Sequence, residues 1–366
     1  MELALSAADA IQPALEHAKQ QLLRPFRFAQ WARLAFVGFL AGEMGSFGGC
    51  NGNFNVPSHA NRGPAHFGAT GLPPYLAQHP GRFVGLIIFS VVIGAGLIVL
   101  FIYIASVMRF ILFDSIIARE CHVRQGWARR KSEGLRLFRW QLLLMVVSFS
   151  TVLVLIGIPL LCAWALDWFM HPREHLAAIL VVGGILLSLF LAVMVLLAVV
   201  NVMTKDFVVP QMAFEEIGAM EGWRRLWLQL KREKGGFAGY IGMKIVLAIG
   251  AAIVFGIVTI IAIFVLLIPI GGIAAGAVVA GMASGLTWNT FTIGLAVIYG
   301  CVALAILVFA GSLISVPTIV FFPAYSIYFF APRFPPLAAL VSLQPTDPTT
   351  PALPWQEPPP SPPAST

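Results

Sequence analysis

Charged side chains are scarce in this sequence. Asp, Glu, Lys and Arg make up 11% of the 366 residues, whereas about a quarter of a soluble domain is charged because its surface must be solvated. The stretch 245–332 contains no charged side chain at all. A bilayer span needs about 20 apolar residues, so this stretch alone has room for several spans. The composition therefore excludes a soluble globular protein.

Cysteine pairs and alternating strands are also lacking. The four cysteines, at positions 50, 121, 162 and 301, form no CxxC pair, which excludes both a zinc module and a disulfide framework. The period-two alternation of a membrane β-barrel is absent. Residues 1–24 lack the ordered regions of a cleaved signal peptide. Because backbone polar groups in lipid must be satisfied internally, the spans are expected to be helices.

The predicted fold is all-α: a polytopic integral membrane protein with six transmembrane helices in three hairpins. An amphipathic surface helix is expected in residues 1–29, and the fifth span is expected to end at Pro269. The tail 331–366 holds 12 of the 25 prolines and is predicted to be disordered. The membrane domain covers 30–330, with spans at 30–47, 83–108, 140–166, 175–203, 241–268 and 291–316.

Lysine and arginine favour one side of these spans. The N-terminus, the segments 109–139 and 204–244 and the tail together hold 20 basic residues, whereas the other side holds three. Cytoplasmic loops carry the excess of basic residues in membrane proteins. This pattern predicts a prokaryotic plasma-membrane protein with both termini in the cytoplasm.

Short motifs recur along the chain. Leu23-Arg24-Pro25-Phe26-Arg27-Phe28 before the first span matches Leu135-Arg136-Leu137-Phe138-Arg139-Trp140 before the third at four of six positions. Phe110-Ile111-Leu112-Phe113-Asp114 and Phe207-Val208-Val209-Pro210 follow the second and fourth spans, and each precedes a Gly-Trp pair, Gly126-Trp127 or Gly222-Trp223. Val316-Pro317-Thr318-Ile319-Val320 is a candidate third copy. We interpret the chain as three parallel hairpins, each preceded by an amphipathic cytosolic surface helix, with 120–138 and 216–233 as two of these helices.

These motifs, with the Gly/Asn-rich loop Gly48-Gly49-Cys50-Asn51-Gly52-Asn53-Phe54-Asn55-Val56-Pro57, resemble a family of uncharacterised prokaryotic multi-pass membrane proteins. That family is allied to the membrane domain found beside glycerophosphodiester phosphodiesterases. The resemblance covers roughly residues 10–330 and implies six helices. It brings no catalytic residues to this chain.

The predicted surface helices carry tryptophans and arginines. Such side chains suit the headgroup region, where each basic residue near an anionic leaflet contributes about 1 kcal/mol. The alternative is that they only fix the topology. The predicted headgroup contacts are Trp127, Arg129, Arg130, Trp223, Arg224 and Arg225.

Two features are candidates for chemistry. Asp167, His171 and His175 are spaced by four, so on a helix they would share a face and could bind a metal ion; the alternative is an interfacial turn, because Pro172 interrupts the pattern. Glu43 is an intramembrane acid, which is by default a functional hypothesis. Counted from Pro25, it lies about 27 Å along a helix, near the outer face, where it could instead simply end the span.

The sequence predicts a non-enzymatic integral membrane protein with no catalytic or cofactor-binding residues. Its expected partners are membrane lipids, with a preference for anionic ones, and other membrane proteins, but not nucleic acid. The expected role is lipid interaction or membrane organisation. The alternative is a small-solute transporter or channel.

The predicted topology can be tested with reporter fusions. Fusions at Trp127 and Trp223 are expected to report the cytoplasm, and a fusion at Pro172 the opposite side, because the basic segments fix the orientation. Activity of compartment-specific reporter enzymes measures this directly. An outside signal from Trp127 or Trp223 would contradict the six-span arrangement.

Overall fold

The computed structural model of this chain describes residues 6–24, 26–43, 80–166, 168, 175–285 and 289–342. These residues are almost entirely helical and contain no strand, as expected for an all-α fold. The helices are α1 (Ile11–Leu23), α2 (Phe28–Leu40), α4 (Pro80–Ala118), α5 (Val123–Ala165), α6 (Leu176–Met203), the π-helix η2 (Thr204–Val208), α7 (Val209–Glu215), α8 (Ala219–Arg232), α9 (Lys234–Ala283), α10 (Thr290–Ile314), α11 (Val316–Phe330), the 3-10 helix η3 (Ala331–Arg333) and α12 (Pro335–Ser342).

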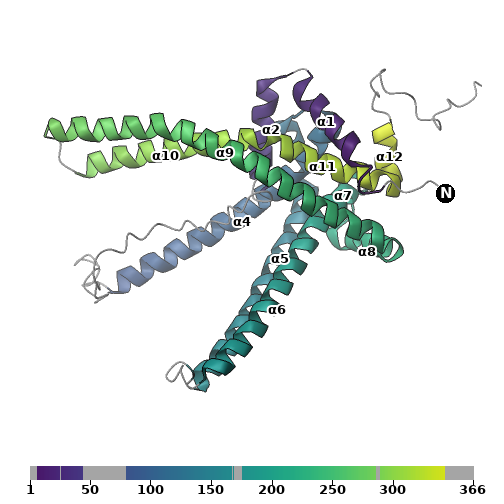
Figure 1. The fold of residues 1–366 in the computed structure, drawn as a ribbon, viewed down its shortest axis with the longest axis horizontal. Coiled ribbons are helices and arrows are strands. Elements are labelled where there is room, and N and C mark those ends of the chain that lie inside the picture. The colour runs from purple at the N-terminus through teal and green to yellow at the C-terminus, as the bar shows by residue number, and fades with distance from the viewer. Residues whose placement is uncertain are drawn as a thin grey trace, which may run out of the picture.

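Three apolar legs extend from a central hub (Figure 1). One leg is α4, the second is α5 beside α6, and the third is α9 beside α10. Within the described residues, five helices are long and apolar enough to cross a membrane, and no residue in the most apolar window of any of them is buried. An apolar surface of this extent is stable in lipid and not in water. The fold is therefore that of a membrane protein.

The buried core lies in the hub, which consists of α1, α2, η2, α7, α8, α11, η3, α12 and the adjoining ends of the legs. In α4 the buried side chains begin at Ser106, and in α9 none is buried beyond Tyr240. Aromatic rings fill the centre: Tyr240 stacks on Phe329 with centroids 4.5 Å apart. Fully burying a large apolar side chain contributes about 1.5–3 kcal/mol. The largest fully buried side chains include Tyr240, Tyr325, Phe110, Phe207, Phe237 and Phe329.

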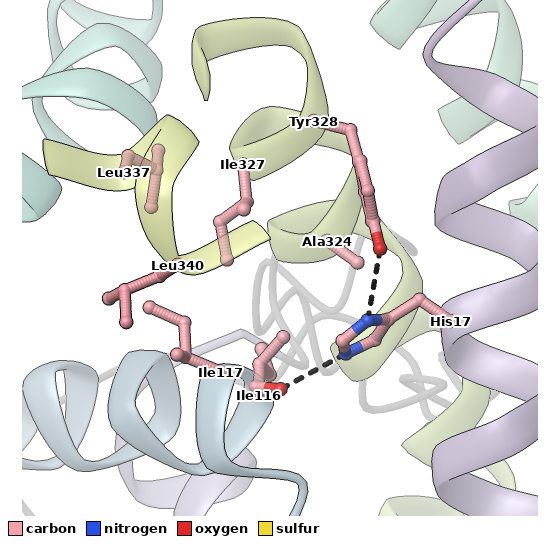
Figure 2. A pocket seen from close by; sticks show the side chains of 8 residues that line it. All are labelled: His17, Ile116, Ile117, Ala324, Ile327, Tyr328, Leu337 and Leu340. Atoms are coloured by element: carbon pink, nitrogen blue, oxygen red, sulfur yellow. Dashed lines mark hydrogen bonds between the residues drawn. The ribbon is translucent and has the colours of Figure 1, made fainter. Parts of the chain in front are cut away.

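Helices α1 and α2 close the end of α4. The last carbonyls of a helix have no partner within it, so they need donors from elsewhere. His17 Nε2 lies 3.0 Å from the Ile116 carbonyl, and Gln21 donates to the Ser115 carbonyl at 2.9 Å. The other nitrogen of His17 lies 3.3 Å from the Tyr328 hydroxyl on α11 (Figure 2). The space beside this histidine measures about 10 Å³, too small for a ligand.

The first predicted span, 30–47, is wrong in its extent. Helix α2 ends at Leu40, and Gly42 follows with a φ of +75°, a left-handed conformation that glycine adopts without strain. Thirteen residues make a helix of about 20 Å, shorter than the roughly 30 Å of the hydrocarbon core. Residues 44–79, which include the Gly/Asn-rich loop, lie outside the described residues.

The surface helix predicted at 120–138 is not a separate element. Residues 123–165 form one continuous helix, α5, because nothing between the basic segment and the apolar run interrupts it. Gly134 serves instead as a contact point with α4. The helix predicted at 216–233 does exist as α8, but its apolar face, including Leu226, is buried in the hub. Helix α1 is likewise buried along Ala14 and Ala18.

Two predicted boundaries also move. Helix α9 continues through Pro269 to Ala283, because in lipid a helix that bends around a proline leaves fewer backbone groups unsatisfied than one that ends there. The predicted disordered tail begins too early: η3 and α12 occupy 331–342, and Phe334 and Leu337 are buried. These two apolar side chains pack on the hub despite the neighbouring prolines. Residues 343–366 lie outside the described residues.

The contact between α4 and α5 requires glycine at position 134. A Cβ atom there would lie 2.5 Å from Val107 Cγ2 and 3.0 Å from Val107 Cα. Gly134→Ala is therefore expected to push the helices apart and to destabilise the protein by about 1–3 kcal/mol, as overpacking does. The matched control is Gly157→Ala on the same helix, where nothing lies within 4 Å. Thermal unfolding in detergent should show a lower unfolding midpoint for Gly134→Ala but not for Gly157→Ala. Equal midpoints of the two variants would contradict the close α4–α5 contact.

Candidate functional site

The π-helix η2 lies where the second leg enters the hub. Pro210, in the first turn of α7, has no backbone N–H, and its ring crowds the carbonyl four residues before it. A wider π turn immediately before the proline relieves this crowding, and such turns are frequent at functional sites. The sequence thus places a local irregularity where the second leg joins the hub.

Successive side chains of this turn contact different parts of the hub. Thr204 accepts a hydrogen bond from Trp223 Nε1 of α8 at 3.1 Å. Asp206 accepts hydrogen bonds from two groups of α9, the Tyr240 hydroxyl at 2.9 Å and Lys244 Nζ at 2.5 Å. Phe207 packs against Phe330 of α11 with centroids 5.2 Å apart. The turn therefore fixes the second leg to the third leg, α8 and α11.

Glu43 completes the site from the end of α2. Its Oε1 lies 3.2 Å from Lys205 Nζ and 3.6 Å from Arg109 Nε. Arg109 also donates to the Ala41 carbonyl at 3.0 Å. Glu43 therefore lies at the hub, beside residues that border the two basic segments, and not at the far end of a span from them. We call the five charged residues Glu43, Arg109, Lys205, Asp206 and Lys244 the junction cluster.

The junction cluster is almost entirely shielded from solvent. Its charged side chains are between 8% and 18% exposed, so each carboxylate needs a nearby cation to remain ionised. Burial acts against the charge of Glu43, but Lys205 and Arg109 outweigh it and lower the pKa of this carboxyl. A lowered pKa stabilises the fold at neutral pH, and this contribution is lost as the pH falls through that pKa.

The predicted headgroup residues on α5 have different surroundings. Arg129 is exposed. Arg130 is buried, and its guanidinium donates to both Asp114 oxygens, at 2.7 and 2.8 Å, and to the Ala213 carbonyl. Trp127 is half-buried against Tyr103. Of these three side chains Arg129 is exposed, Trp127 is half-buried and Arg130 is buried.

On α8 the arginines face outward and the first tryptophan inward. Arg224 is exposed beside Glu221, and Arg225 pairs with both Glu215 and Glu221. Trp223 is half-buried, bonded to Thr204 and next to Trp140. The exposed tryptophan is Trp227, with the ammonium of Lys231 5.6 Å from its ring centroid.

Two of the three predicted metal ligands lie outside the described residues. Asp167 and His171 fall outside the described residues, whereas His175 is described and stacks beside Trp168. Within the described ranges, no group of three or more His, Cys, Asp or Glu side chains could hold a metal ion.

Sequence patterns alone did not identify Arg109, Lys205 or Asp206 as partners of Glu43. The available signal was a dipeptide, Lys205-Asp206, placed directly after the uncharged stretch 176–204 and four residues before Pro210. An adjacent acid and base at the end of a span indicates only a pair of charges at the membrane surface. Which residues they contact depends on segments far away in the chain.

Fold and site together define an all-helical membrane protein whose charged junction joins three apolar legs. The chain belongs to the family of unknown function DUF7544, whose model matches residues 5–340. This match covers the hub and all three legs. No curated protein and no solved structure matches the chain. The link to the glycerophosphodiester phosphodiesterase membrane domain receives no support from these comparisons.

Removing one charge from the junction cluster should destabilise the hub. Glu43→Gln leaves Arg109 and Lys205 without their carboxylate, and breaking a buried ion pair in this way costs about 3–5 kcal/mol. The additional change Lys205→Gln should recover part of this loss because it restores the charge balance. Thermal unfolding in detergent measures both variants.

The matched control is Glu221→Gln, which removes a carboxylate from the exposed pairs of α8. Exposed ion pairs contribute at most about 1 kcal/mol. If Glu43→Gln lowered the unfolding midpoint no more than Glu221→Gln, the junction cluster would not hold the hub together.

Proposed function

We propose that this protein is a non-enzymatic integral membrane protein of the prokaryotic plasma membrane that binds anionic lipids and organises the cytoplasmic face of the bilayer. The three legs anchor it in the hydrocarbon region. The hub lies at the inner surface, where the basic residues are concentrated. Both termini are cytoplasmic in this arrangement.

The observation that carries the proposal is the exposure of the legs. No residue is buried in the most apolar window of any of the five spanning candidates. A solute path through a single chain needs helices that pack around it and exclude lipid. Here the outer parts of the legs present apolar side chains outward, such as Phe149 at 69% and Ile268 at 74% exposed. Such surfaces suit contact with acyl chains.

The outer surface of the hub supports the same role. Arg129 and Arg224 are exposed on α5 and α8, and Trp227, Leu228 and Met220 of α8 are each more than half exposed. Aromatic and basic side chains together are typical of surfaces that meet headgroups. Electrostatic attraction to an anionic leaflet then adds to apolar contact.

A small-solute transporter or channel is the second candidate, and the junction cluster favours it. Ionisable side chains next to membrane spans often mark ion or substrate paths. Against this, both carboxylates of the cluster have cation partners within 4 Å. Pairing of this kind serves to join helices, and it leaves neither carboxylate free to bind a passing cation.

Lipid retention distinguishes the two functions. Lipids that co-purify with the protein in mild detergent should be enriched in anionic species relative to the membrane of origin. Arg129→Ala/Arg224→Ala should reduce this enrichment several-fold, because each basic residue near an anionic leaflet contributes about 1 kcal/mol. Added salt should also reduce it, since the screening length is about 8 Å at physiological ionic strength. Lipid mass spectrometry provides the measurement.

The charge-matched control is Arg129→Lys/Arg224→Lys, which should retain the enrichment. Liposomes containing the wild-type protein should release encapsulated ions and small solutes no faster than empty liposomes. If lipid retention does not depend on headgroup charge and Glu43→Gln abolishes a solute flux, the transporter is favoured.

A further inference from the structure

A groove opens on the hub between α7, α8 and the turn that leads into α12. Its volume is about 450 Å³, within the range of sites that hold small molecules. It is separate from the junction cluster, which contributes no residue to it. One wall is polar and carries Arg225, Arg232 and Arg333, and the other is apolar, with Leu228 and Phe334 followed by two prolines.

Guanidinium groups dominate the polar wall of the groove. Three arginines line the groove with a single carboxylate, Glu215. Arg333 is held in place by Glu233 at 2.9 Å and by the Phe329 carbonyl at 2.7 Å, and Arg225 is held by Glu215 and Glu221. Arg232 has no ion pair among the described residues and is exposed. Two guanidinium groups are thus fixed in advance, and a third is available to an anion.

Two glutamines beside these arginines have unsatisfied polar atoms. Gln211 is only 2% exposed, and its amide nitrogen has no hydrogen-bond partner among the described residues. Gln229 donates to the Arg333 carbonyl at 3.4 Å, while its own oxygen has no partner within the same residues. Buried polar groups are normally paired, so these two side chains, which line the groove, each have one polar group to offer to a ligand once they rotate toward it.

We propose that this groove binds a phosphate group carried by a small polyol, of the kind found in the headgroup of an anionic phospholipid or in a free polyol phosphate. Guanidinium groups match the oxygens of phosphate through paired hydrogen bonds. A rotation of these two side chains toward the groove lets Gln229 accept from a neighbouring hydroxyl and Gln211 donate to a phosphate oxygen. Leu228 and Phe334 cover the carbon skeleton. This inference deepens the proposed function and rests on it only where the phosphate belongs to a lipid.

Direct binding to the full-length protein in detergent tests the site. Calorimetry is expected to show one glycerol 3-phosphate bound per chain, weaker binding of inorganic phosphate, and none of glycerol. Arg232→Gln should weaken glycerol 3-phosphate binding about tenfold, since it removes a charge-assisted hydrogen bond. The control is Lys231→Gln, an adjacent exposed cation that does not line the groove, which should leave the affinity unchanged.

A second arm identifies the source of the phosphate. The protein is placed in phosphatidylcholine nanodiscs with or without phosphatidylglycerol and is then released from them. Native mass spectrometry counts the phosphatidylglycerol molecules that stay bound to the released protein. Loss of one retained molecule in Arg232→Gln but not in Lys231→Gln assigns a lipid to the groove, whereas an effect in calorimetry alone assigns a free polyol phosphate. Identical behaviour of the two variants in both arms overturns the site.

The two proposals can fail separately. If Arg129→Ala/Arg224→Ala abolishes anionic enrichment while Arg232→Gln and Lys231→Gln remain indistinguishable, the groove is excluded and the lipid-binding function stands. If the wild type shows no anionic enrichment but Arg232→Gln weakens glycerol 3-phosphate binding, the groove stands and the lipid function is excluded.

Discussion

One wide helical turn, Thr204–Val208, holds the hub together. Its side chains reach α8, the end of α2, α9 and α11, and Glu43 at the end of α2 in turn pairs with Arg109 of α4. Two of these contacts are charged and shielded, through Lys205 to Glu43 and through Asp206 to Lys244. Shielded charges tolerate few arrangements, because any displacement leaves one of them unpaired. The turn therefore fixes the relative positions of the legs within the hub more strictly than apolar packing alone would.

The class of fold could be predicted from composition, because long uncharged apolar runs are stable only as helices in lipid. The repeated motifs also had a physical cause. A Cβ on Gly126 would lie 3.0 Å from Ile111, and one on Gly222 would lie 2.8 Å from Val208. Both pairs therefore use the same glycine-to-branched-residue contact, and each joins a Gly-Trp pair to the motif that follows a span. The repeated motifs therefore correspond to a repeated helix-packing contact.

Other features could not be predicted, because they depend on which distant segments meet. An amphipathic pattern such as that of α8 shows that one face is apolar, but not whether lipid or protein covers it. The same limit applied to Glu43: an acid near the end of a short apolar segment fits a headgroup location until Arg109 and Lys205 are known to be beside it. The groove was also beyond prediction, since Arg333 of η3 comes to lie beside Arg225 and Arg232 of α8 only in the folded chain.

The contacts between the two ends of the chain set the order in which the protein can be completed. The Tyr325 hydroxyl donates to the Ala7 carbonyl, and Tyr328 meets His17, across more than 300 residues. A Cβ on Gly38 would lie 2.6 Å from Ile319, so α2 is also fitted closely to α11. During synthesis the legs can enter the bilayer one after another, and α1 and α2 can pack on α4, but they lack their second partner until α11 has been made. Because α11 also supplies buried core side chains such as Tyr325 and Phe329, a chain truncated before α11 has anchors but no finished core.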